Sequence, residues 1–199
     1  MNMDINHFRF LLGSKSPRRQ HLLRELGIEY EIVNADVDES YPVHYRGADI
    51  ARYLCRLKAD AFDLSGYPPN TILITADTIV WLNGECIGKP RGREDAIEML
   101  RKISGHTHTV YSGICLRSGS REHVFHAETT VTFKPLTDEE IINYVNHHRP
   151  YDKAGSYGIQ DWIGYIGITG IKGCYYNVMG FPVQKFWEEL QLFTAGLNS

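Results

Sequence analysis

Two arginines stand at the start of a predicted helix, in a segment whose residue types suit phosphate binding. The segment follows an apolar run, Phe8–Leu12, and reads Ser14-Lys15-Ser16-Pro17-Arg18-Arg19. Ser16 is a favoured N-cap and Pro17 a favoured first helical residue. Because a helix N-terminus carries partial positive charge, Arg18 and Arg19 destabilise it unless an anion docks at its free N–H groups. The pattern predicts a phosphate cradle, with a solvated basic turn as the alternative.

Carboxylates follow two of the predicted strands. The acidic loop Asp36-Val37-Asp38-Glu39 comes after the strand expected at Tyr30–Val33, and Asp77 comes after the strand expected at Ile72–Thr75. Neighbouring carboxylates repel each other unless a cation gathers them, and oxygen-rich loops suit Mg²⁺ or Mn²⁺. An Asp at the end of a buried strand needs a partner, and it could bind a metal or act as a general base for water. The alternatives are a solvated acidic turn and an Asx-turn.

Two lysines could contact the same anion. Lys58 shares helical spacing with Ala51, Leu54 and Ala61, so it lies on the apolar face of its helix. There it either reaches along the surface to solvent or projects into a cleft, where its ammonium needs an anion. Lys89 lies in a loop fixed by Gly88 and Pro90, and by itself it indicates little.

An amide residue closes a loop rich in small residues. The loop Tyr151–Gln160 contains charged residues, Gly155, Ser156 and Gly158, and ends with Gln160. A glutamine side chain both donates and accepts hydrogen bonds, so it can recognise the edge of a nucleobase. A purely structural loop is the alternative.

Helical and strand periodicities alternate along the chain and predict the elements that position these residues. The predicted strands are Phe8–Leu12, Tyr30–Val33, Ile72–Thr75, Ile79–Leu82, Thr109–Leu116, Glu122–Phe125, Glu128–Phe133, Trp162–Ile171 and Tyr175–Met179. The predicted helices are Pro17–Leu26, Ala48–Leu64, Arg93–Ile103, Asp138–His147 and Pro182–Leu192. Asn83-Gly84 indicates a tight hairpin, and Thr137 with Glu140 forms a capping box. The order predicts a mixed α/β fold whose sheet is rich in antiparallel hairpins.

Composition limits the class of protein. The 199 residues suit a single domain, and the net charge of −3 gives no general attraction for nucleic acid or an anionic membrane. The four cysteines form no Cys-x-x-Cys pair, which argues against a zinc site or a disulfide framework and fits a reducing cytosol. There is no apolar run long enough for a membrane span and no signal-like N-terminal segment, so we expect a cytoplasmic protein. Histidines without acidic or cysteine partners are expected to be surface or core residues: His106, His108, His147 and His148.

Taken together, the motifs resemble those of the Maf family of nucleotide pyrophosphatases. Six motifs occur in the family's order between Phe8 and Leu190: the Ser-x-Ser-Pro-Arg-Arg segment, Asp36–Glu39, Thr75–Thr78, Gly88–Pro90, Asp152–Gln160 and Tyr175–Pro182. Two positions depart from the family pattern. Gly13 stands where alanine is common, and Trp162-Ile163-Gly164 replaces a Gly-rich stretch that would contribute to the base side of the pocket.

The resemblance implies hydrolysis of nucleoside triphosphates to the monophosphate and pyrophosphate with a divalent metal, Mg²⁺ or Mn²⁺. It also implies an elongated mixed sheet with flanking helices and two lobes around a cleft, similar to inosine triphosphate pyrophosphatases. The catalytic roles carried over are Asp77 as the proton acceptor for water, Glu39 with Asp77 at the metal, and Lys58 and Lys89 against phosphate charge. Ser14, Arg18 and Arg19 would hold the triphosphate.

Substrate choice follows from the same resemblance. The branch of the family that acts on dTTP and UTP is similar to this chain at Arg18, Thr78 and Gln160, and modified pyrimidine triphosphates such as 5-methyl forms are a further expected substrate class. A homodimer is also implied. The alternatives are a 7-methyl-GTP pyrophosphatase and a non-catalytic nucleotide-binding regulator of septum formation. An RNA-binding module is disfavoured by the charge.

Overall fold

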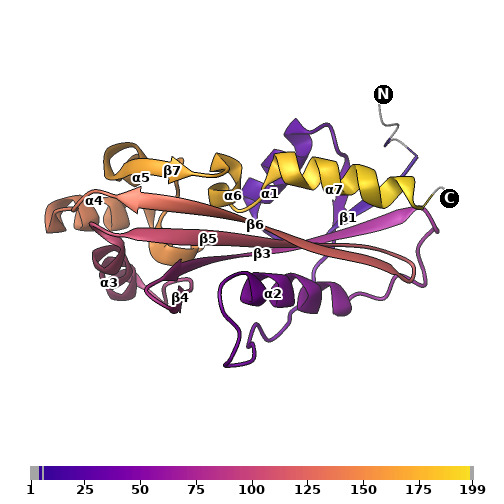
Figure 1. Cartoon of the computed structure of the whole chain (residues 1–199), viewed down its shortest axis with the longest axis horizontal. Helices are drawn as coiled ribbons and strands as arrows, with labels where there is room; N and C mark the ends of the chain where they lie inside the picture. Colours follow the sequence, from indigo (N-terminus) through magenta and orange to yellow (C-terminus); the bar gives the residue numbers. More distant parts are fainter. Residues whose placement is uncertain (1–4, 6, 198–199) are drawn as a thin grey trace. The chain divides into compact units, whose positions relative to one another are not determined.

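The computed structural model describes residue 5 and residues 7–197. Within this part of the chain the strands are β1 (Arg9–Leu12), β2 (Tyr30–Ile32), β3 (Thr71–Leu82), β4 (Glu85–Ile87), β5 (Thr107–Ser118), β6 (Arg121–Phe133) and β7 (Ile168–Lys172). The helices are α1 (Pro17–Glu25), α2 (Ala48–Asp60), α3 (Arg93–Ile103), α4 (Asp138–His148), the 3₁₀ turn η1 (Ala154–Ser156), α5 (Trp162–Gly167), α6 (Tyr175–Met179) and α7 (Val183–Ala195). Figure 1 shows these elements coloured by their position in the sequence, from indigo to yellow.

The strands form one mixed sheet, which confirms the predicted α/β class. Their order is β2-β1-β3-β5-β6-β7, with β4 paired to β3. The chain divides into two compact units. The first comprises the described residues up to Asp77, Ser112–Ala127 and the residues from Gly180 onward; the second comprises Thr78–Tyr111 and Glu128–Met179. Strands β3, β5 and β6 contribute residues to both.

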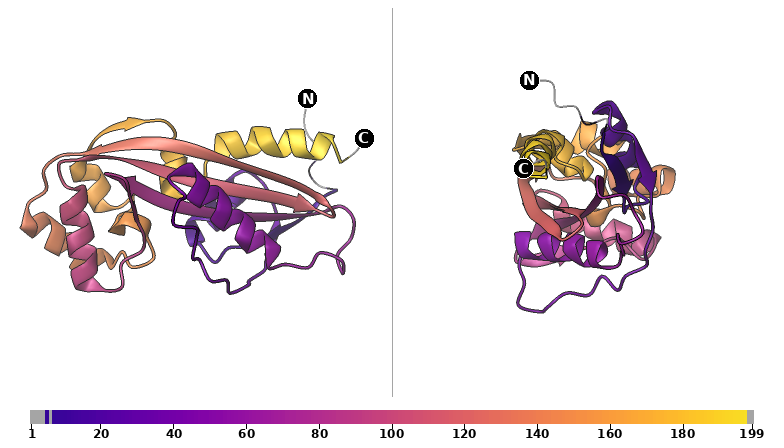
Figure 2. Two further views of the ribbon diagram at one scale, coloured as in Figure 1. Left: turned by 60° about the horizontal axis from the view of Figure 1, so that its bottom comes forward. Right: turned by 90° about the vertical axis from the view of Figure 1, so that its right-hand side faces the viewer.

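Parallel pairing organises the first unit. Strand β1 lies between β2 and β3 and is parallel to both, with Leu12 opposite Ile32 and Ile74. Helices α1 and α7 lie on one face of this part of the sheet and α2 lies on the other (Figures 1 and 2). Covering both faces explains why β1 and the first half of β3 are almost continuously apolar.

Helix α2 packs closely on the sheet. Its Cys55 and Ala59 share a buried cluster with Leu11 and Leu73. Gly113 on β5 permits this approach, because a Cβ at that position would come within 2.2 Å of the Ala51 carbonyl oxygen. The last turn of α2, which carries Lys58, is therefore held against the strands.

Antiparallel pairs and a helical layer organise the second unit. The second half of β3 pairs with β4, and β6 pairs with β7. The hairpin predicted at Asn83-Gly84 is confirmed, since both residues have positive φ, 51° and 85°. Helices α3 and α4 contact each other over a core that includes Leu100 and Val145. The capping box of α4 is also confirmed.

Two predicted strand breaks are wrong. The segments Ile72–Thr75 and Ile79–Leu82 belong to the single strand β3, so Asp77 lies in the middle of a strand and not at its end. Its carboxylate is tolerated there because Lys58 pairs with it. Likewise Glu122–Phe125 and Glu128–Phe133 are parts of one strand, β6.

Two predicted strands near the C-terminus are helical. Trp162–Ile171 is α5 followed by β7, and Tyr175–Met179 is α6. Aromatic and β-branched residues favour strands, but tertiary contacts override that preference here. The Asn177 amide is buried and donates to the Val110 carbonyl oxygen at 3.0 Å, and the backbone of Gly164 packs against that of Ile159 too closely for a side chain.

The remaining differences are confined to element ends. Helix α2 ends at Asp60 and not at Leu64, and the last helix runs Val183–Ala195 and not Pro182–Leu192. Within the described residues, no helix is both long and apolar enough to cross a membrane.

Candidate functional site

Lys58 joins two carboxylates from distant parts of the sequence. Its ammonium donates to Glu39 Oε1 at 2.8 Å and to Asp77 Oδ1. The side chains of Lys58 and Asp77 are only 16% and 11% exposed, so their attraction is screened less than that of a surface pair. Lys58 therefore does not extend along the surface to solvent; it is the centre of a carboxylate–lysine–carboxylate cluster in the first unit.

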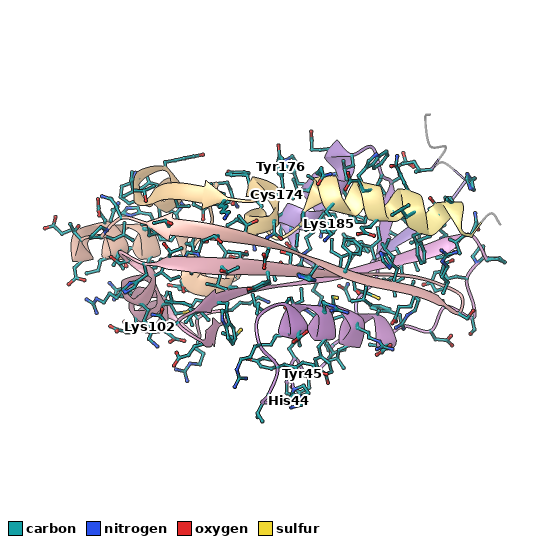
Figure 3. All side chains as sticks on the ribbon, viewed as in Figure 1. His44, Tyr45, Lys102, Cys174, Tyr176 and Lys185 are labelled. Carbon is teal, nitrogen blue, oxygen red and sulfur yellow. The ribbon has the colours of Figure 1, made fainter. Side chains whose placement is uncertain are left out.

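Glu39 reaches this cluster from a loop that is fastened locally. Asp38 accepts from both the backbone N–H and the hydroxyl of Ser40 at 3.1 Å, which forms an Asx-turn. Further along the loop, the ring of Tyr45 meets that of Tyr53 on α2 edge-to-face at 5.5 Å (Figure 3 labels Tyr45). These contacts leave Glu39 as the residue of the acidic loop that contacts Lys58.

The remaining acidic residue of the loop lies at the surface. Asp36 is 3.8 Å from the ammonium of Lys15, and both side chains are largely exposed. Such a pair contributes little stability. The three carboxylates that the sequence places on one loop thus have three different roles.

The start of α1 has the predicted cap. Ser16 Oγ accepts from the backbone N–H of Arg19 at 3.5 Å, and Pro17 is the first helical residue. Ser14 Oγ accepts from the backbone N–H of Ser16 at 3.3 Å and from the Arg19 guanidinium at 3.2 Å. Two hydroxyls and a cation therefore line the strand-to-helix turn.

Arg19 connects this turn to the carboxylate cluster. Its guanidinium also donates to the carbonyl oxygens of Ala76, at 2.8 Å, and Gly180, at 3.0 Å. Burial lowers the pKa of Arg19, while the negative charge of Asp77 opposes that shift. Arg19 thus fixes the strand position next to Asp77 and adds positive charge near it. No local sequence pattern predicts these backbone contacts, because they join residues 57 and 161 positions apart.

The predicted metal site consists of two carboxylates. Among the described residues there is no group of three or more His, Cys, Asp or Glu side chains placed to hold a metal. Mg²⁺ is commonly bound through one or two carboxylates together with substrate phosphates and water. Glu39 and Asp77 fit a metal of that kind, since one oxygen of each carboxylate contacts the same Lys58 ammonium.

The second unit contains the other predicted site residues. The backbone N–H of Gly155 donates to the Gly88 carbonyl oxygen at 3.0 Å, so the loop that carries Lys89 is bonded to the loop that ends at Gln160. Gln160 Oε1 is buried and has no hydrogen-bond partner among the described residues. A buried acceptor without a partner is uncommon and is consistent with a donor supplied by a ligand. Thr78 follows Asp77 directly on β3.

The first unit thus brings together, through hydrogen bonds and ion pairs, Ser14, Arg19, Glu39, Lys58 and Asp77, with Arg18 next to Arg19 on α1. The second unit carries Thr78, Lys89 and Gln160. Sequence reasoning missed Tyr144 and Asp161 of the second unit, whose side chains are hydrogen-bonded at 2.7 Å beside Gln160. The sequence feature that could have pointed to Asp161 is its position directly after Gln160.

The histidine prediction is confirmed. His108 is a core residue: its Nε2 is 2.7 Å from the Tyr157 hydroxyl, and burial lowers its pKa to about 4. His106, His147 and His148 are exposed.

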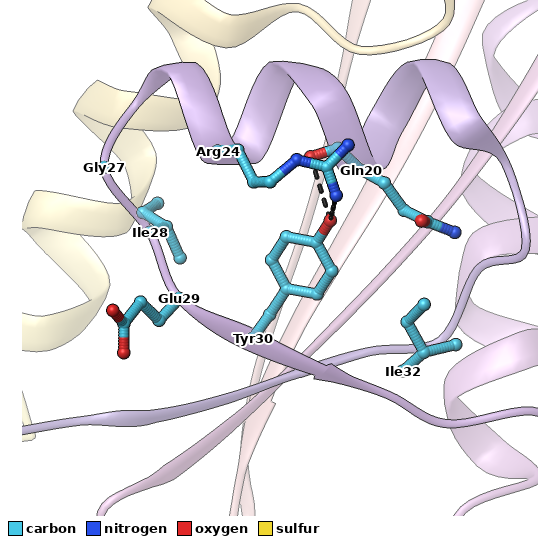
Figure 4. Close-up of a pocket in the computed structure, with 7 residues that line it drawn as sticks. All are labelled: Gln20, Arg24, Gly27, Ile28, Glu29, Tyr30 and Ile32. Atoms are coloured by element: carbon cyan, nitrogen blue, oxygen red, sulfur yellow. Dashed lines mark hydrogen bonds between the residues drawn. The ribbon is translucent and has the colours of Figure 1, made fainter.

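A surface hollow lies between α1 and β2. Tyr30 is at its centre, where its hydroxyl donates to the Gln20 carbonyl oxygen at 2.9 Å and accepts from Arg24 at 2.8 Å (Figure 4). The hollow contains none of the predicted site residues.

Comparisons of the sequence with a family model and with named relatives agree on one family. The sequence model described as "Maf-like protein" matches residues 9–193. The protein named dTTP/UTP pyrophosphatase of Bacteroides thetaiotaomicron is 49% identical over 189 residues, 94% of this chain and 97% of that protein. The one of the same name from Porphyromonas gingivalis is 45% identical over 96% of each chain. Among solved structures, a HAM1 protein from Coxiella burnetii matches 92% of this chain and 98% of its own with a TM-score of 0.48 and 15% identity.

Proposed function

The chain belongs to the family of Maf-like proteins, and we propose that it hydrolyses dTTP and UTP to the nucleoside monophosphate and pyrophosphate. The observation that carries the activity is the cluster in which Lys58 holds Glu39 and Asp77. The substrate is proposed from relatives named dTTP/UTP pyrophosphatase, which match nearly the whole chain. Because the family match spans both units, we treat them as parts of one pyrophosphatase domain.

In the proposed reaction Asp77 is the general base. Its carboxylate takes a proton from water as the water oxygen bonds to phosphorus, the anhydride bond breaks and pyrophosphate leaves. Lys58 holds the Asp77 carboxylate in place and offers positive charge to the phosphates. A divalent metal bound by Glu39 and Asp77 would polarise a phosphoryl oxygen and neutralise charge.

The start of α1 is the proposed triphosphate cradle. The positive end of the α1 dipole, the Ser14 hydroxyl and the guanidinium groups of Arg18 and Arg19 are suited to phosphate oxygens. Arg19 already uses part of its donor capacity within the protein, so it supports the cradle as well as supplying charge. Lys89 is assigned the same phosphate-neutralising role by the family resemblance.

Base selection is assigned to the second unit. The buried, unpartnered Oε1 of Gln160 can accept from the N3–H of thymine or uracil, and its amide N–H can donate to a ring carbonyl. Arg18 and Thr78 are the other positions shared with the dTTP/UTP branch. Modified pyrimidine triphosphates remain a proposed substrate class on the same grounds.

The test is pyrophosphate release from dTTP, UTP, CTP, GTP, ATP and 7-methyl-GTP with Mg²⁺ or Mn²⁺. We expect release from dTTP and UTP that a chelator abolishes and either metal restores. Release from 7-methyl-GTP alone would overturn the base assignment and keep the chemistry. Release from none of them would favour a nucleotide-binding regulator.

Placement in the cytoplasm and assembly as a homodimer also remain proposals. The first rests on the four widely spaced cysteines, all of which are free thiols. The second rests on the family resemblance alone, and light scattering of the purified protein tests it.

A further inference from the structure

Gln160 occupies the third position of a tight turn. The backbone N–H of Asp161 donates to the Gly158 carbonyl oxygen at 3.0 Å, which closes the four-residue turn Gly158-Ile159-Gln160-Asp161. Ile159 is buried in the core of the second unit, at 4% exposure, so the turn cannot rotate as a whole. The orientation of the Gln160 side chain is therefore decided by what fixes the two ends of this turn.

One buried hydroxyl contacts both ends. Tyr144 Oη accepts from the backbone N–H of Gly158 at 3.2 Å and donates to Asp161 Oδ2 at 2.7 Å. Tyr144 lies on α4, has no exposed surface, and is 14 residues from Gly158 in sequence. It therefore couples the turn to a rigid helix and not to another mobile loop.

The rest of the neighbourhood supports the same geometry. The Lys153 ammonium lies 3.7 Å from Asp161 Oδ2, which balances the charge of that carboxylate. A side chain at position 158 would displace the Asp161 carboxylate, because a Cβ there would come within 2.5 Å of it. Ser156, in the same segment, has a positive φ of 59°, a strained conformation that persists only where the surroundings impose it.

We propose that the Tyr144 hydroxyl, through Gly158 and Asp161, is the positioning group that sets the direction of Gln160 and thereby the base selectivity. Tyr144 acts through the turn and is not a catalytic residue. This inference rests on the proposed function, because it takes Gln160 to be the group that recognises the base.

The test is the ratio of kcat/KM for dTTP to that for CTP in Tyr144→Phe, which removes the hydroxyl and nothing else. We expect the ratio to fall roughly five- to tenfold, the equivalent of about one hydrogen bond, through a higher KM for dTTP with kcat nearly unchanged. In a Gln160→Ala background, Tyr144→Phe should not lower the ratio further, because the group that it positions is gone.

Tyr157→Phe is the matched control. It also removes a buried tyrosine hydroxyl from the second unit, but that hydroxyl contacts His108 Nε2 at 2.7 Å and not the turn. We expect Tyr157→Phe to lower thermal stability while the dTTP to CTP ratio is retained. Equal losses of selectivity in Tyr157→Phe and Tyr144→Phe would overturn the proposal, since they would reflect general loosening of the core.

Asp161→Ala covers the case in which Tyr144→Phe does not fold. Its side chain is 17% exposed, and the substitution removes the other partner of the same hydroxyl. Loss of selectivity supports the proposal, and full selectivity in a folded Tyr144→Phe or Asp161→Ala protein overturns it. If the wild type releases no pyrophosphate from any nucleotide, the proposed function fails, and the inference fails with it; wild-type selectivity that survives in the variants contradicts the inference alone.

Discussion

At the scale of single residues, the Lys58 ammonium joins the carboxylates of Glu39 and Asp77. Two carboxylates at this separation would otherwise repel each other, and Asp77 is largely buried within a strand. The same arrangement shows that the Lys58 side chain is paired and mostly buried and does not run along the surface to solvent. A lysine ammonium that is held in this way can also interact with a phosphate oxygen of a bound substrate.

Lys58→Gln should lower kcat for dTTP hydrolysis by about two to three orders of magnitude, because it removes charge that is already in position. Pyrophosphate release at saturating substrate is the measurement. Lys102→Gln is the control, since Lys102 is an exposed lysine on α3 (Figure 3). A Lys58→Gln enzyme as active as the Lys102→Gln enzyme would contradict the role of Lys58.

At the scale of elements, α1 illustrates what a sequence predicts well. Its cap and first residue are local features, and the structure confirms Ser16 and Pro17 in these positions. The break predicted in β3 was wrong because the partner of Asp77 comes from α2, 19 residues earlier, and no local pattern shows that pairing. The segments misassigned as strands near Trp162 and Tyr175 failed for the same reason, since buried contacts of Gly164 and Asn177 decide their conformation.

Ser16→Ala tests whether the cap of α1 also serves the substrate. Loss of the cap should lower the free energy of unfolding by about 1 kcal/mol, and it should raise KM for dTTP because the first helical turn, which carries Arg18 and Arg19, loses its alignment. Urea unfolding and steady-state kinetics measure the two effects.

Thr137→Ala is the matched control for that experiment, because Thr137 caps α4 in the same way, with Oγ1 accepting from the Glu140 N–H at 3.2 Å. It should lower stability by a similar amount and leave KM unchanged. If Thr137→Ala raises KM as much as Ser16→Ala does, the start of α1 has no special part in binding.

At the scale of the whole molecule, the family match spans both units, and the predicted site residues are divided between them. The sequence was sufficient for the α/β class and for most helices, and it supplied the residues proposed for the candidate site except Tyr144 and Asp161. It could not show that Tyr144 fixes the turn of Gln160 or that Arg19 binds the carbonyl oxygen next to Asp77, because both are contacts between segments far apart in sequence.

The stability of the whole chain should decrease as the pH falls below about 6.5. Burial lowers the pKa of His108 to about 4, so between these pH values the unfolded chain binds a proton that the folded chain does not. The stability that results from this pKa difference of His108 is fully present above pH 6.5 and is lost toward pH 4. The loss in the free energy of unfolding is on the order of 3 kcal/mol. Denaturant unfolding across this range measures it.

His108→Gln should reduce that pH dependence, whereas replacement of the exposed His106 by Gln should keep it. The difference between the two variants isolates the contribution of His108 from that of the carboxylates. Parallel stability curves for His108→Gln and the wild type would show that this histidine is not the group responsible.

The proposed reaction depends on Asp77 as the group that takes a proton from water. Its most direct test is Asp77→Asn, which keeps the size of the side chain and removes its ability to take a proton. Pyrophosphate release from dTTP and the dissociation constant of dTTP should be measured on the same preparation. We expect turnover to fall by orders of magnitude while dTTP still binds; full turnover in Asp77→Asn would show that Asp77 is not the base.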